Sequence, residues 1–146
     1  MKIAVDSNIL VYAHVARFAE HERARGWIQQ QLEQPDVTLV TTPLILSEVV
    51  HVITDPRRFT PPVPMREALE LARNWLGRSN VECLSVDDEA TALAFDLMDR
   101  HGLGRSRLAD TLLAGTLLVH QVTVLATHNV IDFSVFGELR LIDPVA

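Results

Sequence analysis

The sequence contains a single cysteine and no long uninterrupted run of apolar residues. Cys83 has no partner for a disulfide within the chain, which excludes a disulfide-stapled fold and is typical of proteins from a reducing cytoplasm. Residues 37–53 form the most apolar stretch, but polar residues and a proline interrupt it, so it does not predict a membrane span. Asp6 follows the first residues too soon for the apolar region of a signal peptide. We therefore expect a cytoplasmic protein with no membrane segment.

Positive charge is also scarce, because 13 lysine and arginine residues stand against 19 aspartate and glutamate residues, for a net charge of −6. This balance excludes a protein that holds nucleic acid by bulk electrostatic attraction. It leaves open an enzyme whose bound metal ions supply the positive charge. Two local basic groups, Arg57-Arg58 and Arg105 with Arg107, are candidates for phosphate contacts, although surface arginines are more often simply solvated.

Several catalytic motifs are absent as well. The chain has no phosphate-binding loop that ends in Gly-Lys-Ser/Thr, no Gly-x-Ser-x-Gly nucleophile elbow and no His-Glu-x-x-His zinc site. Glu48 and His51 have the Glu-x-x-His spacing of di-iron helix bundles, but such bundles need the motif twice and the chain has one copy. The chemistry must therefore be sought among the carboxylates.

What the sequence does contain is a regular alternation of strand-like and helical segments. Hydrophobic residues make up 48% and charged residues 22%, which is the balance of a globular protein. Strands are expected at residues 2–5, 37–41, 81–86, 123–126 and 139–142. Helices are expected at residues 9–14, 16–33, 43–55, 65–78, 89–101 and 107–120. Strands separated by helices predict a three-layer α/β/α fold around a central parallel sheet of about five strands, and we expect a single domain over residues 1–146.

Local signals set some of these boundaries. Thr42-Pro43 is a strong helix start, with threonine as the N-cap and proline in the first helical position. Pro56 should end that helix, because proline disfavours helical geometry in the residue before it. Ser85-x-x-Asp88 resembles a capping box that opens the helix of residues 89–101. Cys83 lies in the third expected strand, where we expect it to be a buried small hydrophobic residue.

Three acidic residues stand out by their positions. Asp6 follows the first strand, and ligands of open parallel sheets bind beyond the carboxyl ends of the strands; the alternative is that Asp6 only caps the next helix. Glu48 lies two turns into its helix, where a solvated helix face is the alternative. Asp110 is the only charged residue between Leu108 and Val119, in a helix so apolar that we expect it to be buried. A buried carboxylate needs a partner or a metal ion.

Gathering such carboxylates in one place requires a cation. At ~6 Å and an effective dielectric constant of ~20, each pair of like charges repels by roughly 3 kcal/mol. Without a cation, some of the carboxyls would stay protonated. Oxygen ligands suit Mg²⁺ or Mn²⁺, ions that orient a phosphodiester, activate water and stabilise the leaving oxygen. After the fourth strand, Asn129 and Asp132 are candidates for further ligands, although turn formation alone would also explain them.

Short motifs around these acids together resemble the PIN-domain family. They are Asp6-Ser7-Asn8-Ile9-Leu10-Val11-Tyr12-Ala13, Leu46-Ser47-Glu48-Val49-Val50 and Leu108-Ala109-Asp110-x-x-Leu113-Ala114. The chain is more narrowly similar to VapC-type toxins of bacterial toxin–antitoxin pairs, through Thr54-Asp55-Pro56-Arg57-Arg58-Phe59 and His21-x-x-Ala24-x-x-Trp27. The order, spacing and strand context of the motifs extend the resemblance from Lys2 to Pro144.

The resemblance implies a PIN-like fold and a Mg²⁺- or Mn²⁺-dependent endoribonuclease that hydrolyses RNA phosphodiester bonds. It implies that Asp6, Glu48 and Asp110 are the catalytic residues and the main metal ligands. It also implies a homodimer, and inhibition by a small VapB-like antitoxin whose C-terminal segment inserts toward the acidic pocket.

The fourth position of the site departs from the family pattern. Relatives often carry an acid soon after the threonine that is Thr127 here, whereas this chain has His128 and Asn129. The resemblance therefore points to Asp132, with Asn129 as a second candidate. Because of this departure, one alternative is a catalytically impaired PIN-like binding module that acts through a protein partner. A phosphatase that uses Asp6 as its nucleophile would want a second aspartate two residues later, which the chain lacks.

Overall fold

The computed structural model describes all residues from Met1 to Ala146. Its central sheet consists of β1 (Lys2–Val5), β2 (Thr38–Thr41), β3 (Val81–Cys83), β4 (Val124–Ala126) and β5 (Arg140–Ile142). Every pairing between neighbouring strands is parallel, and the strand order is β3-β2-β1-β4-β5. The predicted parallel sheet of five strands is therefore confirmed.

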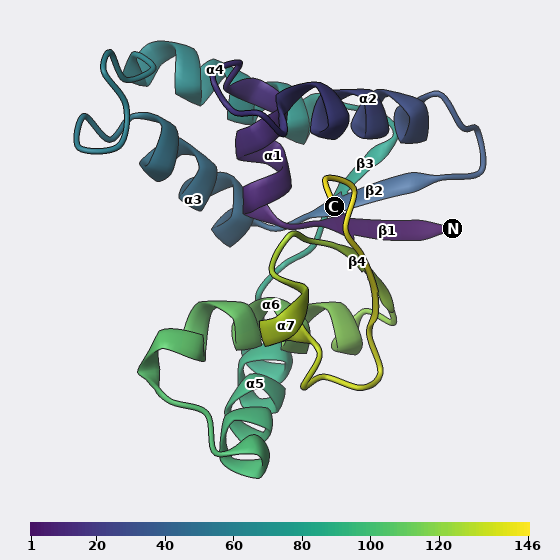
Figure 1. The fold of residues 1–146 in the computed structure, drawn as a ribbon. Coiled ribbons are helices and arrows are strands. Elements are labelled where there is room, and N and C mark those ends of the chain that lie inside the picture. Colours follow the sequence, from purple (N-terminus) through teal and green to yellow (C-terminus); the bar gives the residue numbers. More distant parts are fainter.

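Helices cover both faces of this sheet. They are α1 (Ser7–His14), α2 (His21–Leu32), α3 (Pro43–Ile53), α4 (Met65–Gly77), α5 (Asp88–His101), α6 (Leu108–Val119) and α7 (Val130–Phe133), and a 3₁₀ turn, η1 (Arg105–Arg107), leads into α6. In Figure 1, α1 to α4 lie on one side of the sheet and α5 to α7 lie on the other. This arrangement is the predicted three-layer α/β/α fold. None of the helices combines the length and the apolar character that a membrane span requires.

The central strand β1 and its neighbour β4 carry short, continuously apolar buried segments. Ile3, Ala4 and Val5 of β1 are buried, as are all three residues of β4. A strand covered by helices on both faces cannot alternate between apolar and polar residues, which explains these short continuous hydrophobic runs. The central strands are thus held rigidly, and they fix the positions of the residues that follow them.

The start of α3 agrees with the prediction, whereas the start of α5 does not. The hydroxyl of Thr42 accepts a hydrogen bond of 3.1 Å from the Ile45 N–H, with proline in the first turn. At α5 the N-cap is Asp87, whose carboxylate accepts from the Ala90 N–H over 2.9 Å. The capping box predicted at Ser85 is therefore wrong. Asp87 is as good a capping residue as serine, and its negative charge is stabilised at a helix N-terminus.

Two further predictions are corrected by tertiary contacts. The second helix begins at His21 rather than Ala16. Residues 16–20 form turns instead, and Phe18 in this segment packs edge-on against Tyr12, with ring centroids 5.1 Å apart. Cys83 is exposed rather than buried. It is the last residue of β3, which ends three residues earlier than expected and lies at the edge of the sheet.

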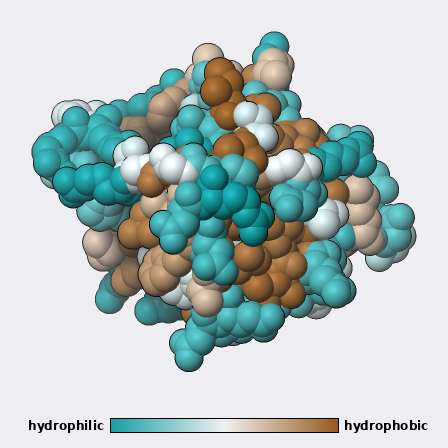
Figure 2. All heavy atoms as spheres, turned by 90° about the horizontal axis from the view of Figure 1, so that it is seen from below, coloured by the Kyte–Doolittle hydropathy of each residue, from teal (hydrophilic) through white to brown (hydrophobic).

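The face that carries α5 to α7 shows apolar surface among its hydrophilic side chains. Figure 2 views the molecule from below and shows hydrophobic residues grouped near the centre of this face. Large apolar side chains exposed on these helices are Phe95 of α5, Leu108 of α6 and Ile131 of α7. Contiguous exposed apolar surface of this kind is typical of protein–protein contacts.

Candidate active site

The topology of the sheet directs attention to the ends of β1 and β4. These strands are neighbours, but the chain leaves β1 toward β2 on one side and reaches β4 on the other. Such a reversal of strand order opens a crevice at the carboxyl ends of the two strands, where open α/β sheets bind their ligands. The residues that follow these strands are Asp6 and Thr127, and both are buried.

Asp6 is held by several hydrogen bonds at the start of α1. Its Oδ1 accepts from the Ser7 N–H over 2.8 Å, so Asp6 does cap the helix. Its Oδ2 accepts from the Thr127 hydroxyl over 2.7 Å and from the Asn8 amide over 3.3 Å. Burial raises the pKa of Asp6, the hydrogen bonds from Thr127 and Ser7 lower it, and the charge of Glu48 raises it. Asp6 is therefore both the N-cap of α1 and a candidate metal ligand, so the structural and the functional interpretation of Asp6 are compatible.

Asn8 ties the two strand ends together, a role that was not predicted for it. Its amide also lies 3.5 Å from the Thr127 hydroxyl oxygen, and its side-chain carbonyl accepts from the His128 N–H over 3.2 Å. The Asn129 N–H in turn donates to the Thr127 hydroxyl oxygen over 3.0 Å. The one hint in the sequence was the place of Asn8 as the third residue of the Asp-Ser-Asn motif.

Glu48 approaches from the opposite helical layer to Asp110. Glu48 is exposed on α3, and Asp110 lies in the first turn of α6. Although they come from different layers, the charges of Asp6 and Glu48 both raise the pKa of Asp110. The structure thus brings together the three acids that the sequence singled out separately.

Asp110 is half-buried, so the expectation of a fully buried carboxylate is wrong. The apolar face of α6 is buried along later turns, whereas Asp110 occupies the exposed start of the helix. Desolvation and then the charge of Asp6 raise its pKa to about 6, and the nearby Arg107 opposes this shift. The amide of Asn129 donates to Oδ2 of Asp110 over 3.4 Å. Asn129 is thus in reach of the site.

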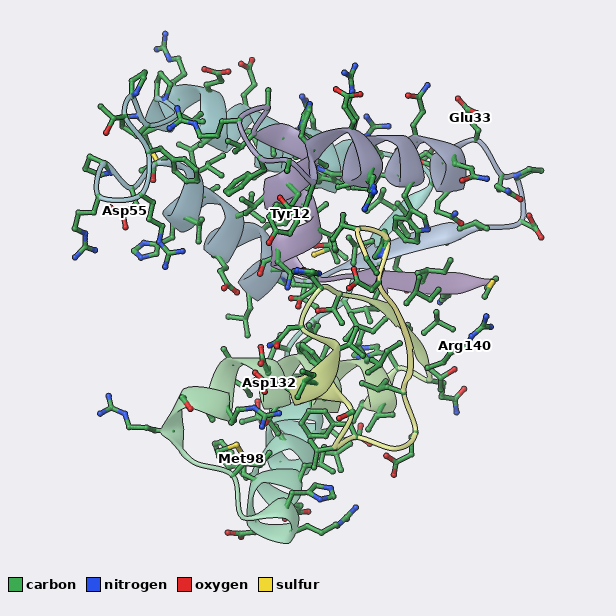
Figure 3. All side chains as sticks on the ribbon, viewed as in Figure 1. Tyr12, Glu33, Asp55, Met98, Asp132 and Arg140 are labelled. Carbon is green, nitrogen blue, oxygen red and sulfur yellow. The ribbon has the colours of Figure 1, made fainter.

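Asp132 lies beside the site but is not integrated into the hydrogen-bond network through its carboxylate. It belongs to α7, and Figure 3 places it on the α5–α7 side of the sheet. Its charge contributes to raising the pKa of Asp110. Its backbone carbonyl accepts a hydrogen bond from the guanidinium of Arg107, whose Nε is buried without a partner. Arg107 is thus fixed next to the acids, whereas Arg105 is exposed.

The donor set fits a hard divalent cation. All candidate ligands are oxygens, and the mutual repulsion of the carboxylates is what a cation would relieve. No group of three histidine, cysteine, aspartate or glutamate side chains is close enough together to hold a metal ion by itself. Mg²⁺ keeps several water molecules and needs only one or two carboxylates directly, so an open cluster of this kind is compatible with it.

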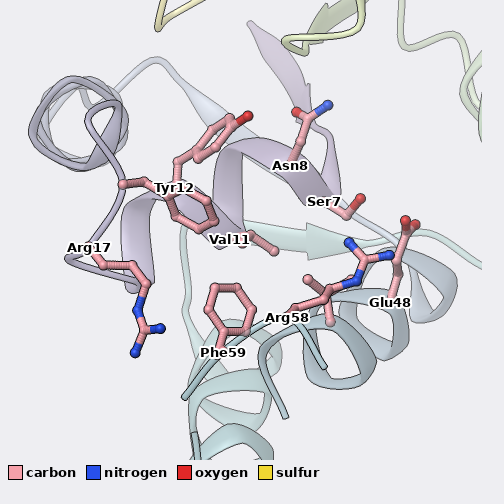
Figure 4. A pocket seen from close by; sticks show the side chains of 10 residues that line it. Ser7, Asn8, Val11, Tyr12, Arg17, Glu48, Arg58 and Phe59 are labelled. Atoms are coloured by element: carbon pink, nitrogen blue, oxygen red, sulfur yellow. The ribbon is translucent and has the colours of Figure 1, made fainter. Parts of the chain in front are cut away.

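A cavity of ≈ 500 Å³ adjoins the acidic cluster on the side of α1 and α3 (Figure 4). Glu48, Ser7 and Asn8 line its inner wall. The other walls are formed by Val11, Tyr12, Arg17, Phe18, Val52, Arg58 and Phe59. Of the basic groups noted in the sequence, Arg58 therefore reaches the neighbourhood of the site, and Arg57 does not line the cavity. The convergence of three aromatic rings here was not anticipated.

The comparison with protein families identifies the class. The family model described as PIN domain matches residues 3–137. This match includes the strands β1 to β4, the three acids and the segment after β4, and it ends before β5. The chain belongs to the PIN-domain family, and the predicted membership is confirmed.

Within this family the relatives are VapC ribonucleases. Ribonuclease VapC43 of Mycobacterium tuberculosis (strain ATCC 25618 / H37Rv) is 36% identical over 143 residues, covering 98% of this chain and 95% of the relative. The crystal structure of VapC20 from Mycobacterium tuberculosis, described as a sarcin–ricin loop cleaving toxin, has a TM-score of 0.72 at 19% identity and covers 92% of this chain and 95% of that chain. The structure of VapBC-1 from nontypeable Haemophilus influenzae has a TM-score of 0.68 at 18% identity and full coverage of both chains, 100% and 100%. The two structures confirm the PIN-like fold, and the prediction of a VapC-type ribonuclease is confirmed at the level of the family.

Proposed function

We propose that this protein is a divalent-metal-dependent endoribonuclease and the toxin of a VapBC-type toxin–antitoxin pair. The observation that carries the proposal is the convergence of Asp6, Glu48 and Asp110 from three different elements on one crevice of the sheet. The 36% identity to a VapC ribonuclease over nearly the whole chain supports RNA as the substrate.

Asp6 and Asp110 are proposed as the main metal ligands, with Glu48 binding metal or orienting the attacking water. Asn129 and Asp132 are proposed to complete the ligand set, since one bonds to Asp110 and the other influences its pKa. A bound Mg²⁺ or Mn²⁺ would supply water activation and stabilisation of the leaving oxygen. The all-oxygen donor set supports either ion.

Neighbouring residues of the chain hold the side chains of this site in place. Thr127 and Asn8 hold Asp6 in one orientation, so that little reorganisation is needed when a ligand binds. Arg107 supplies a fixed positive charge beside Asp110, where a phosphate oxygen of the RNA would lie. The net charge of −6 makes such local cations necessary for holding a polyanion.

A small VapB-like antitoxin and a second copy of the chain are the proposed protein partners. The likeness to the VapBC-1 structure supports the antitoxin. The exposed apolar residues Phe95, Leu108 and Ile131 offer surface that a partner would cover. The homodimer remains a prediction, to be checked by the mass of the purified protein in solution.

Cleavage of RNA in the presence of Mg²⁺ or Mn²⁺ tests the activity. The native protein is expected to produce internal cuts, and Asp6→Asn and Asp110→Asn are expected to lose them. Asparagine caps a helix as well as aspartate, so Asp6→Asn should still fold. Asp96→Asn is the matched control. Asp96 is exposed on α5, so this substitution removes the same charge away from the site. Full activity in either site variant, or no cutting by the native protein with either ion, would overturn the proposal.

A further inference from the structure

The cavity beside the acidic cluster has the features of a binding site in its own right. Its volume of ≈ 500 Å³ lies within the range of about 300–1,000 Å³ that is usual for small-molecule sites. Tyr12, Phe18 and Phe59 line it, and Phe59 comes from a part of the sequence distant from the other two. In Figure 4 the Phe59 ring lies at the base of the cavity, across from Tyr12. Phe59 belongs to the hydrophobic core, and Tyr12 and Phe18 are partly buried residues packed against it.

The rings are arranged so that they keep each other in place. Tyr12 meets Phe18 edge-on at 5.1 Å, and Phe18 meets Phe59 edge-on at 5.8 Å. The guanidinium of Arg17 lies 5.2 Å from the centre of the Phe59 ring and donates to the carbonyl of Pro61 over 3.3 Å. The aromatic wall is therefore formed in the absence of a ligand, and such preorganisation lowers the entropic cost of binding.

Two polar groups at this cavity remain able to contact a ligand. The Tyr12 hydroxyl makes no hydrogen bond within the chain, and burial raises the pKa of Tyr12, so the phenol stays a donor near neutral pH. Arg58 is largely exposed, and its Nε lies 3.7 Å from Oδ2 of Asp55. In Figure 4 its guanidinium points toward Glu48 at the boundary with the acidic cluster. Arg58 is therefore positioned between the cavity and the site of cleavage.

We propose that this cavity holds one unstacked nucleobase of the RNA, next to the phosphate at the acidic cluster. The inference rests on the proposed function, which it deepens by assigning a base-binding subsite. A single-stranded RNA presents such bases, and proteins bind them on aromatic faces. Glu48, Ser7 and Asn8 belong to both the cavity and the acidic cluster, so a base in one places its own phosphate near the other.

The charges of the cavity favour RNA over a peptide as its occupant. Arg17 and Arg58 are its two cations, and Glu48 is its one acid, on the wall shared with the metal ligands. With a metal ion at the acidic cluster, this region is positive, which attracts a phosphate chain and repels a basic peptide segment. A peptide occupant is kept as an outcome of the test.

The test compares binding of oligo-U RNA with binding of the same sugar–phosphate chain without bases. Dissociation constants are measured by fluorescence anisotropy in EDTA, which prevents metal-dependent cleavage. The native protein is expected to bind oligo-U more tightly by about tenfold or more, because stacking of a single base contributes about that much. A change in the charge of a variant, or in its fraction of folded protein, affects both dissociation constants alike. The ratio of the two constants is therefore insensitive to such changes.

Filling the cavity should abolish this ratio. Val52 is half-buried on α3 and lines the cavity, so Val52→Phe is expected to bring the ratio close to one. Val50→Phe is the matched control, because Val50 is half-buried on the same helix but faces a groove toward α4, and this variant should keep the native ratio. Tyr12→Leu is expected to reduce the ratio as well, and it replaces Val52→Phe if melting shows that the latter does not fold. Arg58→Ala should weaken binding of both chains equally and leave the ratio unchanged.

The outcomes separate this inference from the proposed function. A native ratio near one, or an unchanged ratio in folded Val52→Phe and Tyr12→Leu, overturns the base subsite, whether or not the protein cuts RNA. If these variants keep the native ratio but bind the antitoxin more weakly, the cavity binds a protein segment instead, and the base subsite is likewise overturned. If the ratio behaves as expected but no cleavage occurs with Mg²⁺ or Mn²⁺, the subsite stands and the proposed activity fails.

Discussion

The hydroxyl of Thr127 donates a hydrogen bond of 2.7 Å to Oδ2 of Asp6, and this bond joins the carboxyl ends of β4 and β1. Thr127 is completely buried, and its hydroxyl oxygen also accepts the Asn129 N–H over 3.0 Å. One threonine therefore orients Asp6 directly and, through Asn129, the segment that reaches Asp110. A single hydroxyl thus links Asp6 to the segment that reaches Asp110.

Replacing this hydroxyl should reduce both stability and activity. Thr127→Val keeps the shape of the side chain but removes the shorter of the two hydrogen bonds to Oδ2 of Asp6 and leaves the Asn129 N–H without its partner. We expect a loss of about 1–3 kcal/mol in the free energy of unfolding, measured by urea denaturation, and a marked fall in the cleavage rate. Thr116→Val is the control, because Thr116 is equally buried and donates to the Leu112 carbonyl, away from the acids. A normal cleavage rate in Thr127→Val would contradict the orienting role.

The raised pKa of Asp110 predicts a specific dependence of stability on pH. Its pKa is about 6 in the folded protein against 3.8 for the ordinary carboxyl, because of desolvation and the charge of Asp6. Between these values the folded state binds more protons than the unfolded state, so without metal the contribution of Asp110 to stability falls as pH rises from about 4 to about 6 and is constant above that.

Asp110→Asn removes this titrating carboxyl. As the pH rises from about 4 to about 6, the melting temperature of the variant should therefore increase relative to that of the native protein. Differential scanning calorimetry in EDTA measures the difference at each pH. The exposed Asp96→Asn should show no such trend. A constant difference between Asp110→Asn and the native protein would mean that Asp110 is not perturbed in the way described.

Gly115 marks a close approach of α6 to α5. A Cβ atom on Gly115 would lie 2.7 Å from the Ala90 carbonyl oxygen and 3.1 Å from the Ala94 nitrogen. Gly115→Ala therefore has to push the two helices apart, and we expect it to destabilise the protein by about 1–3 kcal/mol. Gly26→Ala is the matched control in α2, where nothing lies within 4 Å, and it should stabilise by about 0.5–1 kcal/mol. Chemical denaturation of both variants checks the pair, and equal effects would show that α5 and α6 can separate freely.

The parts of the structure that follow from local rules were predictable. Thr42-Pro43 starts a helix because the cap and the proline act on neighbouring backbone groups. Asp6 was placed correctly because a residue after a central parallel strand must lie at the carboxyl edge of the sheet. Asp110 was placed near this edge by its position in a first helical turn, whereas the place of Glu48 beside the other two acids came from the family resemblance.

The parts that depend on distant contacts were not predictable. Phe18 lies in a turn before α2, where its ring contacts Tyr12 and Phe59. No pattern near residue 18 indicates either partner. The aromatic cavity was missed for the same reason. Cys83 was expected in the interior, but its exposure depends on β3 lying at the edge of the sheet, which strand propensity does not reveal. The roles of Asn129 and Asp132, and the single-domain extent over residues 1–146, remain predictions.

Binding of Mn²⁺ followed by the melting temperature tests the central claim, that Asp6, Glu48 and Asp110 together hold a divalent metal ion. At about 100 times the dissociation constant, a ligand that binds only the folded state adds about 2.7 kcal/mol, which for a chain of this length raises the melting temperature by roughly 5–10 °C. We predict this rise for the native protein and for Asp96→Asn, and little or none for Asp6→Asn and Asp110→Asn. No rise in the native protein, as a catalytically impaired binding module would show, or an equal rise in both site variants, would contradict the account.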